Sequence, residues 1–266
     1  MSTGVKTSML RVNDLKISVT NRNKKQHILV NNVSFDVAAG EVLSIIGPNG
    51  AGKSSILRAI DGDLEYSGSI YSEALERDPR QRAKRFAVLP QQSSLNFPFN
   101  VSEVVELGRT PHETGKRRDR EIIDSALELM DISYLKNRDY MLLSGGEKQR
   151  VQLARVFSQI WDGDTNKPRL LLLDEPSSSL DLGHQHHLMK AIRKFAEQGV
   201  TIVVVMHDIN LAARYADKML ALLCSEQVAY GSPKQVVTEN IMRRLYGLNV
   251  EVLSSSKHGH PVLIGA

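Results

Sequence analysis

The stretch Gly47-Pro48-Asn49-Gly50-Ala51-Gly52-Lys53-Ser54 decides the fold of this chain. It fits the pattern G-x-x-x-x-G-K-[ST], and average residue usage puts a chance match in a chain of this length on the order of one per cent. An apolar run, Glu41–Ile46, precedes it, and Ser54–Asp61 follows with helical spacing. Glycines let the loop curl so that backbone N–H groups converge, and the start of the helix adds positive potential. The sequence therefore predicts a phosphate-binding loop between a strand and a helix.

A second motif, Leu170–Glu175 with the sequence LLLLDE, is an apolar run that ends in two carboxylates. In open α/β folds, ligands bind at the carboxyl ends of parallel strands. We expect Asp174 to hold Mg²⁺ through its water shell and Glu175 to orient and polarise an attacking water as a general base. Lys53 would reach the β- and γ-phosphates of a nucleotide, and Ser54 would ligate Mg²⁺.

A third motif, Leu143–Arg150 with the sequence LSGGEKQR, places a second glycine pair at the start of a helix. Ser144 and the N–H groups of Gly145 and Gly146 would form another anion site there. The alternative is an ordinary helix start that Ser144 caps. Two phosphate-binding surfaces that face different ways suggest a nucleotide shared across a subunit interface.

Together, LSGGEKQR, the phosphate-binding loop and LLLLDEP resemble the ATP-binding subunit of ABC transporters, from about Leu10 to the end of the chain. The resemblance implies an α/β, P-loop NTPase ABC-ATPase fold with an N-terminal antiparallel β subdomain and an inserted α-helical subdomain. It implies one nucleotide-binding domain over residues 1–266. The RecA-like core with the β subdomain would cover about 1–99 and 165–266, and the helical subdomain about 100–164. ATP and Mg²⁺ are the implied cofactors.

The resemblance also assigns roles by position. Gln91 matches the glutamine that contacts Mg²⁺ or the water and signals to the membrane subunit. Asp181 would lie at the dimer seam, and His207 would contact the γ-phosphate, although a lone histidine after a strand is more often structural. The expected catalytic residues are Glu175, His207, Lys53 and Gln91, and the expected Mg²⁺ ligands are Ser54, Gln91 and Asp174. The expected nucleotide contacts are Gly47, Pro48, Asn49, Gly50, Ala51, Gly52, Lys53, Ser54, Ser55, Ser144, Gly145, Gly146 and Asp181.

Further segments resemble importers of iron-siderophores, haem and vitamin B12: Leu89–Gln91, Gly108–His112, Leu180–Gln185 and His207–Asp217. The polar insertion Trp161–Pro168 is most similar to hemin-import ATPases. The resemblance implies an ATP-hydrolysing motor subunit of a bacterial inner-membrane importer, with haem as cargo. The subunit would be a homodimer on the cytoplasmic face, bound to two integral-membrane permease subunits. A periplasmic substrate-binding protein would act through these permease subunits.

Other functions stay open at this point: the ATPase of a ferric-siderophore or vitamin B12 importer, an export or non-iron import motor, or a soluble ABC ATPase acting on nucleic acid or ribosomes. Translation-type members carry two cassettes, and repair-type members contain a long coiled coil. This chain has one cassette, and only about fifty residues separate Gln91 from Leu143. No nucleic-acid partner is therefore expected.

The composition is that of an ordinary globular protein, with 41% hydrophobic and 24% charged residues among 266. The net charge, 34 − 30 = +4, is too small to indicate nucleic-acid binding. The single cysteine, Cys224, cannot form an internal disulfide and is expected to be a small buried apolar residue. No run approaches the roughly 18 apolar residues of a membrane helix, and Met1–Lys16 lacks the features of a secretory signal.

Hydrophobic patterning predicts the order of the elements. The expected strands are Leu10–Val19, Ile28–Val37, Gly68–Tyr71, Phe86–Leu89, Leu170–Leu173, Val200–Met206 and Met219–Leu223. The expected helices lie between about Asn100 and Trp161, and at Gln185–Gln198 and Ile209–Tyr215. The cluster of His184, His186 and His187 is expected on a solvated helix face, because such close positions do not face the same way. The basic run Lys116–Arg120 is expected to be a solvated helix start, with contact to anionic lipid as the alternative.

One departure from the family concerns the nucleobase. ABC subunits usually carry an aromatic residue in the first sheet that stacks on adenine, and the matching position falls near Val19. No Tyr, Phe or Trp precedes Phe35. Stacking is worth roughly 1–3 kcal/mol per base in nucleic-acid systems, so weaker or less selective recognition of the base is expected.

Overall fold

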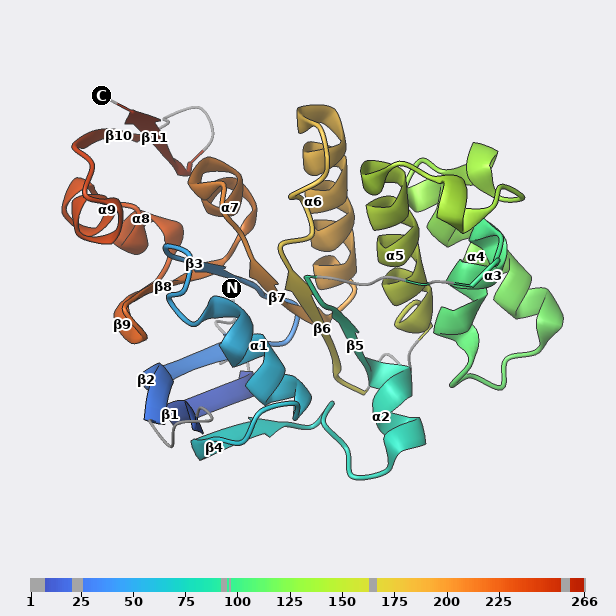
Figure 1. The fold of residues 1–266 in the computed structure, drawn as a ribbon, viewed down its shortest axis with the longest axis horizontal. Coiled ribbons are helices and arrows are strands. Elements are labelled where there is room, and N and C mark those ends of the chain that lie inside the picture. The colour runs from blue at the N-terminus through green and yellow to red at the C-terminus, as the bar shows by residue number, and fades with distance from the viewer. Residues whose placement is uncertain are drawn as a thin grey trace, which may run out of the picture. The chain divides into compact units, whose positions relative to one another are not determined.

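The computed structural model describes residues 8–20, 26–91, 95, 97–162, 167–254 and 259–265. The chain divides into two compact units, which we call the first unit (Met1–Glu73 with Thr201–Ala266) and the second unit (Ala74–Val200). The helical subdomain expected at about 100–164 falls inside the second unit. Figure 1 labels the elements of both units.

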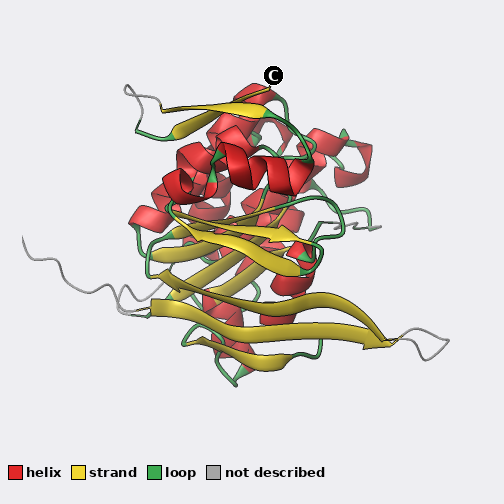
Figure 2. Cartoon of the chain, turned by 90° about the vertical axis from the view of Figure 1, so that its left-hand side faces the viewer, coloured by secondary structure: helices red, strands yellow, loops and turns green. Residues whose placement is uncertain are grey.

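Two long antiparallel strands form one edge of the first unit. These are β1 (Ser8–Thr20) and β2 (Gln26–Ala38), and β4 (Ser67–Ser72) pairs with the other side of β1. Figure 2 shows the two strands as long yellow ribbons that run side by side. Their alternating apolar residues are buried: Leu10, Val12, Leu15, Ile17, Val33, Phe35 and Val37. This arrangement is the antiparallel β region that the sequence predicts.

The rest of this sheet is built around β3 (Val42–Ile46), a fully buried strand. It runs parallel to β7 (Val200–Val205) on one side and to β8 (Lys218–Leu223) on the other. A hairpin joins β8 to β9 (Glu226–Gly231), and β9 meets β2, so the order is β4-β1-β2-β9-β8-β3-β7. Strands buried on both faces explain the continuous apolar runs in the sequence. Helices α1 (Lys53–Asp61) and α7 (Ile209–Tyr215) follow β3 and β7.

The C-terminal part of the first unit contains elements that the hydrophobic pattern did not predict. They are α8 (Pro233–Val236), α9 (Glu239–Tyr246) and a hairpin of β10 (Val250–Ser254) and β11 (Pro261–Gly265). In Figure 2 this hairpin lies next to the marked C-terminus. Met242 and Leu245 of α9 are buried, which anchors this helix.

The second unit combines two parallel strands with a group of helices. Strand β5 (Phe86–Leu89) pairs with β6 (Arg169–Asp174) after α2 (Pro79–Arg85), and α6 (Leu182–Glu197) follows β6. Helices α3 (Val101–Glu106), α4 (Lys116–Leu129) and α5 (Gly145–Gln159) pack together, as Figure 1 shows, with short turns η1 (Leu107–Arg109), η2 (Ser133–Leu135) and η3 (Tyr140–Leu142). The helical character predicted here and the basic start of α4 are confirmed. In the part of the chain that the structure describes, no helix is long and apolar enough to span a membrane.

The expected burial of Cys224 is wrong, because this residue is exposed. Strand β8 ends at Leu223, which pairs with Glu226 at the start of β9. Cys224 and Ser225 form the two-residue turn between them, with φ angles of 48° and 70°. Positive φ at both central residues is the conformation of a type I′ hairpin turn. The strand ends at Leu223 as expected, but Cys224 belongs to the turn, and its thiol lies outside the core.

The histidine cluster on α6 is less solvated than expected. His187 is exposed, whereas His184 and His186 are half-buried. The His187 ring nitrogen Nε2 lies 2.6 Å from the carbonyl oxygen of Leu129 at the end of α4. In the described ranges no group of three or more His, Cys, Asp or Glu residues is arranged to hold a metal ion.

Candidate active site

The glycine-rich loop after β3 is packed so closely that two of its glycines are required by the fold itself. Gly47 has φ 146°, and a Cβ atom there would lie 2.2 Å from the carbonyl oxygen of Leu222 on β8. Gly52 has φ 101°, and a Cβ atom there would lie 2.3 Å from the carbonyl oxygen of Leu29 on β2. Only glycine adopts these angles and tolerates this approach.

The loop curls around the ammonium group of Lys53. This Nζ atom donates hydrogen bonds to the carbonyl oxygens of Gly47, at 2.8 Å, and Pro48, at 2.9 Å. Lys53 is only 5% exposed. Helix α1 begins directly after Gly52, and this N-cap has no side chain that could satisfy the N–H groups of the first turn. A buried cation and an uncapped helix start make this loop suited to a polyphosphate anion.

His207 lies at the same edge of the sheet as this loop. Strands β3 and β7 run parallel with Ile45 paired to Val205, and Met206 N–H donates to the Ile45 carbonyl oxygen at 3.1 Å. Gly47 and His207 each follow the paired residue by two positions, so the strand ends bring them to one edge. The histidine is exposed, and Asp208 caps the helix α7 that follows.

The second unit brings Gln91 and Glu175 together in the same way. Leu89 of β5 pairs with Leu173 of β6, and both functional side chains follow these strand ends. The Gln91 amide Nε2 donates to Glu175 Oε2 at 3.0 Å. Glu175 has a φ of 50°, in the left-handed region where a glutamate backbone is strained. Asp174, the last residue of β6, is 6% exposed.

Ser144 caps helix α5, as the structural alternative for the LSGGEKQR motif requires. Its N–H and its hydroxyl both donate to Glu147 Oε2 at 2.8 Å, and Glu147 N–H donates back to Ser144 Oγ at 3.4 Å. The hydrogen bonds from Ser144, first that of its backbone, hold the pKa of Glu147 below its ordinary value. This capping box explains Ser144 and Glu147 without any ligand.

The two glycines of this motif differ in what the fold requires of them. A Cβ atom at Gly146 would lie 2.9 Å from the Ser179 carbonyl oxygen, whereas one at Gly145 would have no neighbour within 4 Å in the part of the chain that the structure describes. Packing within the chain therefore accounts for a glycine at residue 146 but not for one at residue 145. A small residue facing open space at a helix start leaves room for a ligand or another molecule to approach the backbone.

Asp181 begins α6 as its N-cap. Its carboxylate accepts from the His184 N–H at 2.9 Å, and the His184 ring Nδ1 lies 2.8 Å from the second carboxylate oxygen. These bonds from the backbone and side chain of His184 lower the pKa of Asp181. The carboxylate is thus ionised and held at the tip of the helix.

The sequence from residue 30 to residue 178, which includes the loop and the LLLLDE strand, matches the family described as ABC transporter. This chain belongs to the ABC transporter family. As a family member it is an ATP-binding subunit that hydrolyses ATP.

Individual ABC proteins resemble the chain over nearly its full length. The hemin import ATP-binding protein HmuV of Pseudomonas fluorescens strain Pf0-1 is 45% identical, and the alignment covers 96% of this chain and 99% of that protein. The solved structure of a metal-chelate type ABC transporter in an inward-facing conformation superposes with a TM-score of 0.77 at 24% identity, over 98% of both chains. A bacterial ABC transporter cassette solved as a dimer has a TM-score of 0.74 at 26% identity, over 84% of this chain and 98% of that one. The predicted ABC-ATPase fold is confirmed.

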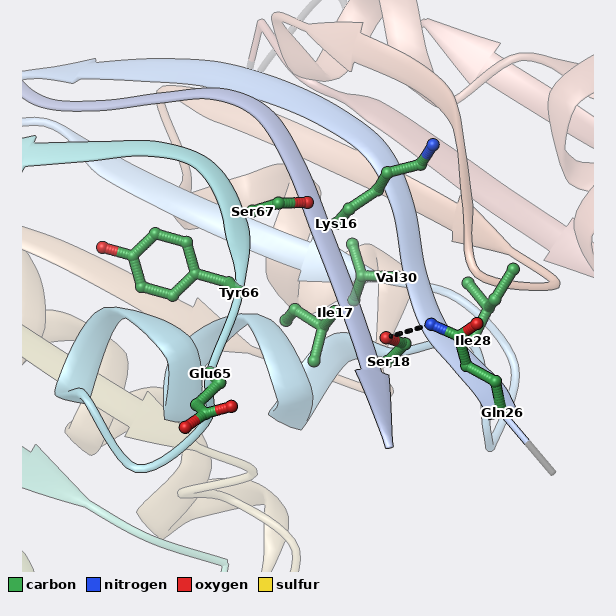
Figure 3. A pocket seen from close by; sticks show the side chains of 9 residues that line it. All are labelled: Lys16, Ile17, Ser18, Gln26, Ile28, Val30, Glu65, Tyr66 and Ser67. Atoms are coloured by element: carbon green, nitrogen blue, oxygen red, sulfur yellow. Dashed lines mark hydrogen bonds between the residues drawn. The ribbon is translucent and has the colours of Figure 1, made fainter. Parts of the chain in front are cut away.

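Strand β1, in the region where ABC subunits usually stack adenine, carries no aromatic residue among its described positions Ser8–Thr20. Val19 is 37% exposed. Beside it lies a hollow of about 450 Å³, lined by Lys16, Ile17, Ser18, Gln26, Ile28, Val30, Glu65, Tyr66 and Ser67. Figure 3 shows the Gln26 amide bonded to Ser18 Oγ, at 2.8 Å, and the Tyr66 ring pointing away from both. Val30 lies between this hollow and the glycine-rich loop. A Cβ atom placed on Gly52 would be 3.1 Å from Val30 Cγ2.

Two residues near the ABC motifs make contacts that the sequence did not predict. Tyr246 ends α9, where burial raises the pKa of its phenol and the nearby backbone of Gly47 lowers it. Asn210 in α7 is hydrogen-bonded to Leu263 of β11. For Asn210, the one indication in the sequence was its place in the family-like segment His207–Asp217. No hydrophobic periodicity predicts the C-terminal elements that contain Tyr246 and Leu263.

Proposed function

We propose that this chain is the ATP-hydrolysing motor of a bacterial ABC importer for haem, bound to the cytoplasmic face of the inner membrane. The observation that carries the proposal is the 45% identity to a hemin import ATP-binding protein over almost the whole of both chains. The chain works as a homodimer on two integral-membrane permease subunits, which receive haem from a periplasmic binding protein. Nucleic acid has no part in this function.

The glycine-rich loop and Lys53 bind the phosphates of ATP. The loop residues Gly47 to Ser54, except Pro48, supply backbone N–H groups, as does the first turn of α1 with Ser55. Lys53 neutralises the β- and γ-phosphates. Ser54, Asp174 and Gln91 would hold Mg²⁺, since hydroxyl, carboxylate and amide oxygens are the ligands that this ion prefers. When bound, the ion offsets the negative charge that develops on the transferring phosphoryl group.

Glu175 activates the water that attacks the γ-phosphorus. The new bond forms between the water oxygen and phosphorus, the bond from phosphorus to the bridging oxygen breaks, and the water proton passes to the Glu175 carboxylate. ADP and inorganic phosphate leave. His207 donates a hydrogen bond to the γ-phosphate. Catalysis in this scheme comes mostly from positioning and electrostatic stabilisation.

A second copy of the chain completes each site. Ser144, Gly145 and Gly146 of one copy bind the nucleotide held by the loop of the other, and Asp181 lies at the seam between the copies. The open space beside Gly145 and the N–H groups of the helix start support this role. Closure of the dimer around two nucleotides moves the permease subunits, and hydrolysis of the nucleotides lets the dimer open again.

Transport in vesicles tests the cargo. The chain is reconstituted with its membrane subunits and binding protein, and uptake of haem, a ferric siderophore and cobalamin is compared in the presence of ATP. ATP-dependent uptake of haem alone supports the proposal. Uptake of either other compound in preference to haem assigns the motor to a different importer. Co-purification of RNA with the chain, with no dependence on a membrane partner, would instead favour the nucleic-acid class.

The lack of an aromatic residue near Val19 predicts weak discrimination between nucleobases. GTP is expected to compete with ATP for the site nearly as well as ATP itself, because stacking on an aromatic ring is worth about 1–3 kcal/mol per base and is missing here. A competition titration with a fluorescent ATP analogue measures the ratio. Val19→Tyr is the matched variant, and it is expected to tighten nucleotide binding. A preference of the unchanged chain for ATP of more than about a hundredfold, near 2.7 kcal/mol, would contradict this prediction.

A further inference from the structure

Asn210 joins the helix after His207 to the C-terminal hairpin. It lies in the first turn of α7, three residues after the histidine. Its Nδ2 donates to the Leu263 carbonyl oxygen at 3.0 Å, and the Leu263 N–H donates to its Oδ1 at 2.7 Å. One side chain thus pairs with both backbone groups of a strand residue, much as a neighbouring strand would.

The segment that carries His207 depends on such anchors. Helix α7 has seven residues, too few for stability without tertiary contacts. Before it, Met206 is bonded to β3. Within it, the Leu211 N–H donates to Asp208 Oδ1 at 2.9 Å, which caps the helix but does not fix its direction. The two bonds to Leu263 tie the first turn to β11, and this tie restricts where the histidine side chain can point.

The hairpin is also joined to the helix that precedes it. Arg243 Nε donates to Asn249 Oδ1 at 2.8 Å, which links α9 to the start of β10. Met242 and Leu245 of α9 are buried. The hairpin that holds Asn210 is therefore anchored to the core of the first unit through α9.

We infer that the C-terminal hairpin of β10 and β11 positions the start of α7, with Asn210 as a positioning residue for His207. Asn210 does not touch the reacting atoms. The inference rests on the proposed function, in which His207 contacts the γ-phosphate. It adds a structural requirement outside the ABC motifs: the hairpin must be docked on Asn210 for the histidine to act.

Kinetics of Asn210→Ala in the full chain test the inference. We expect kcat for hydrolysis of MgATP to fall about tenfold, because a small misplacement of a group at the reacting centre is costly, while KM changes little. Asn249→Ala is the matched control, since it removes one amide contact from the same segment without touching α7 or the loop. It should leave both constants unchanged.

A double-mutant cycle separates positioning from general loss of structure. If Asn210 acts through His207, then Asn210→Ala should lower kcat in the unchanged chain and have no further effect in His207→Ala. An equal drop in both backgrounds, or no drop at all, overturns the inference. If His207→Ala itself leaves kcat unchanged, the role of His207 in the proposed function fails instead. If Asn210→Ala does not fold, Asn210→Asp replaces it in the same double-mutant cycle. The aspartate keeps an acceptor for the Leu263 N–H but has no donor for the Leu263 carbonyl oxygen.

Discussion

Replacing Glu175 with glutamine is expected to lower kcat for ATP hydrolysis by about 10²–10⁴-fold, the usual contribution of a positioned general base. The amide cannot take the proton of the attacking water. Its oxygen can still accept the hydrogen bond that Gln91 now donates to Glu175 Oε2 at 3.0 Å, so the local arrangement should persist. Nucleotide binding should therefore stay within a few-fold of that of the unchanged chain. Single-turnover hydrolysis and equilibrium binding of ATP measure the two quantities separately.

Glu113→Gln is a suitable control for this variant. Glu113 is exposed and has no role in the proposed reaction, so this change removes one carboxylate of the same kind and should leave the rate unaltered. If Glu175→Gln hydrolyses ATP at nearly the original rate, Glu175 is not the base.

Replacing Lys53 with alanine is expected to weaken ATP binding strongly. The ammonium group is almost fully buried and points into the curl of the loop, where it bonds to the carbonyl oxygens of Gly47 and Pro48. A hydrogen bond to a charged group contributes about 1.5–3 kcal/mol, roughly a ten- to hundredfold rise in the Kd for ATP. Lys53→Arg should not restore affinity, because a planar guanidinium does not fit where a compact ammonium is enclosed. Isothermal titration calorimetry measures the Kd.

The control for Lys53 comes from the same helix. Arg58 of α1 is exposed, and Arg58→Ala removes a cation without altering the loop. An equal loss of affinity in Arg58→Ala would mean that net charge governs binding, and an unchanged Kd in Lys53→Ala would mean that the loop does not hold the phosphates.

Local patterns predicted much of the fold because burial imposes them directly. The apolar run Phe86–Leu89 and the helical spacing of Ile209–Tyr215 coincide with β5 and α7. Helix α2 was missed because its sequence, PRQRAKR, has no apolar stripe; Asp78 as N-cap and Pro79 at the first position start it instead. The hairpin turn at Cys224 was missed because cysteine and serine are not typical residues for positive φ.

The motifs predicted the residues of the site but not all of their contacts. Gln91 and Glu175 are 84 positions apart and meet only because β5 and β6 pair in one register. The contact between Asn210 and Leu263 depends on how β11 packs against α7, which no nearby residue encodes. A motif specifies the chemistry that a site needs, whereas the elements that hold it in place are set by packing between distant segments.

The central claim is that each nucleotide is shared by two copies of the chain, and sedimentation of Glu175→Gln with MgATP tests it most directly. The account predicts a species of twice 29.6 kDa with MgATP, and the monomer without nucleotide. It also predicts that adding Gly145→Asp abolishes this dimer without lowering the unfolding temperature. A Cβ atom at residue 145 has no neighbour within 4 Å among the described residues, and the carboxylate would lie where the partner's nucleotide would bind. A strictly monomeric Glu175→Gln at saturating MgATP, or a dimer that Gly145→Asp leaves intact, would contradict the account.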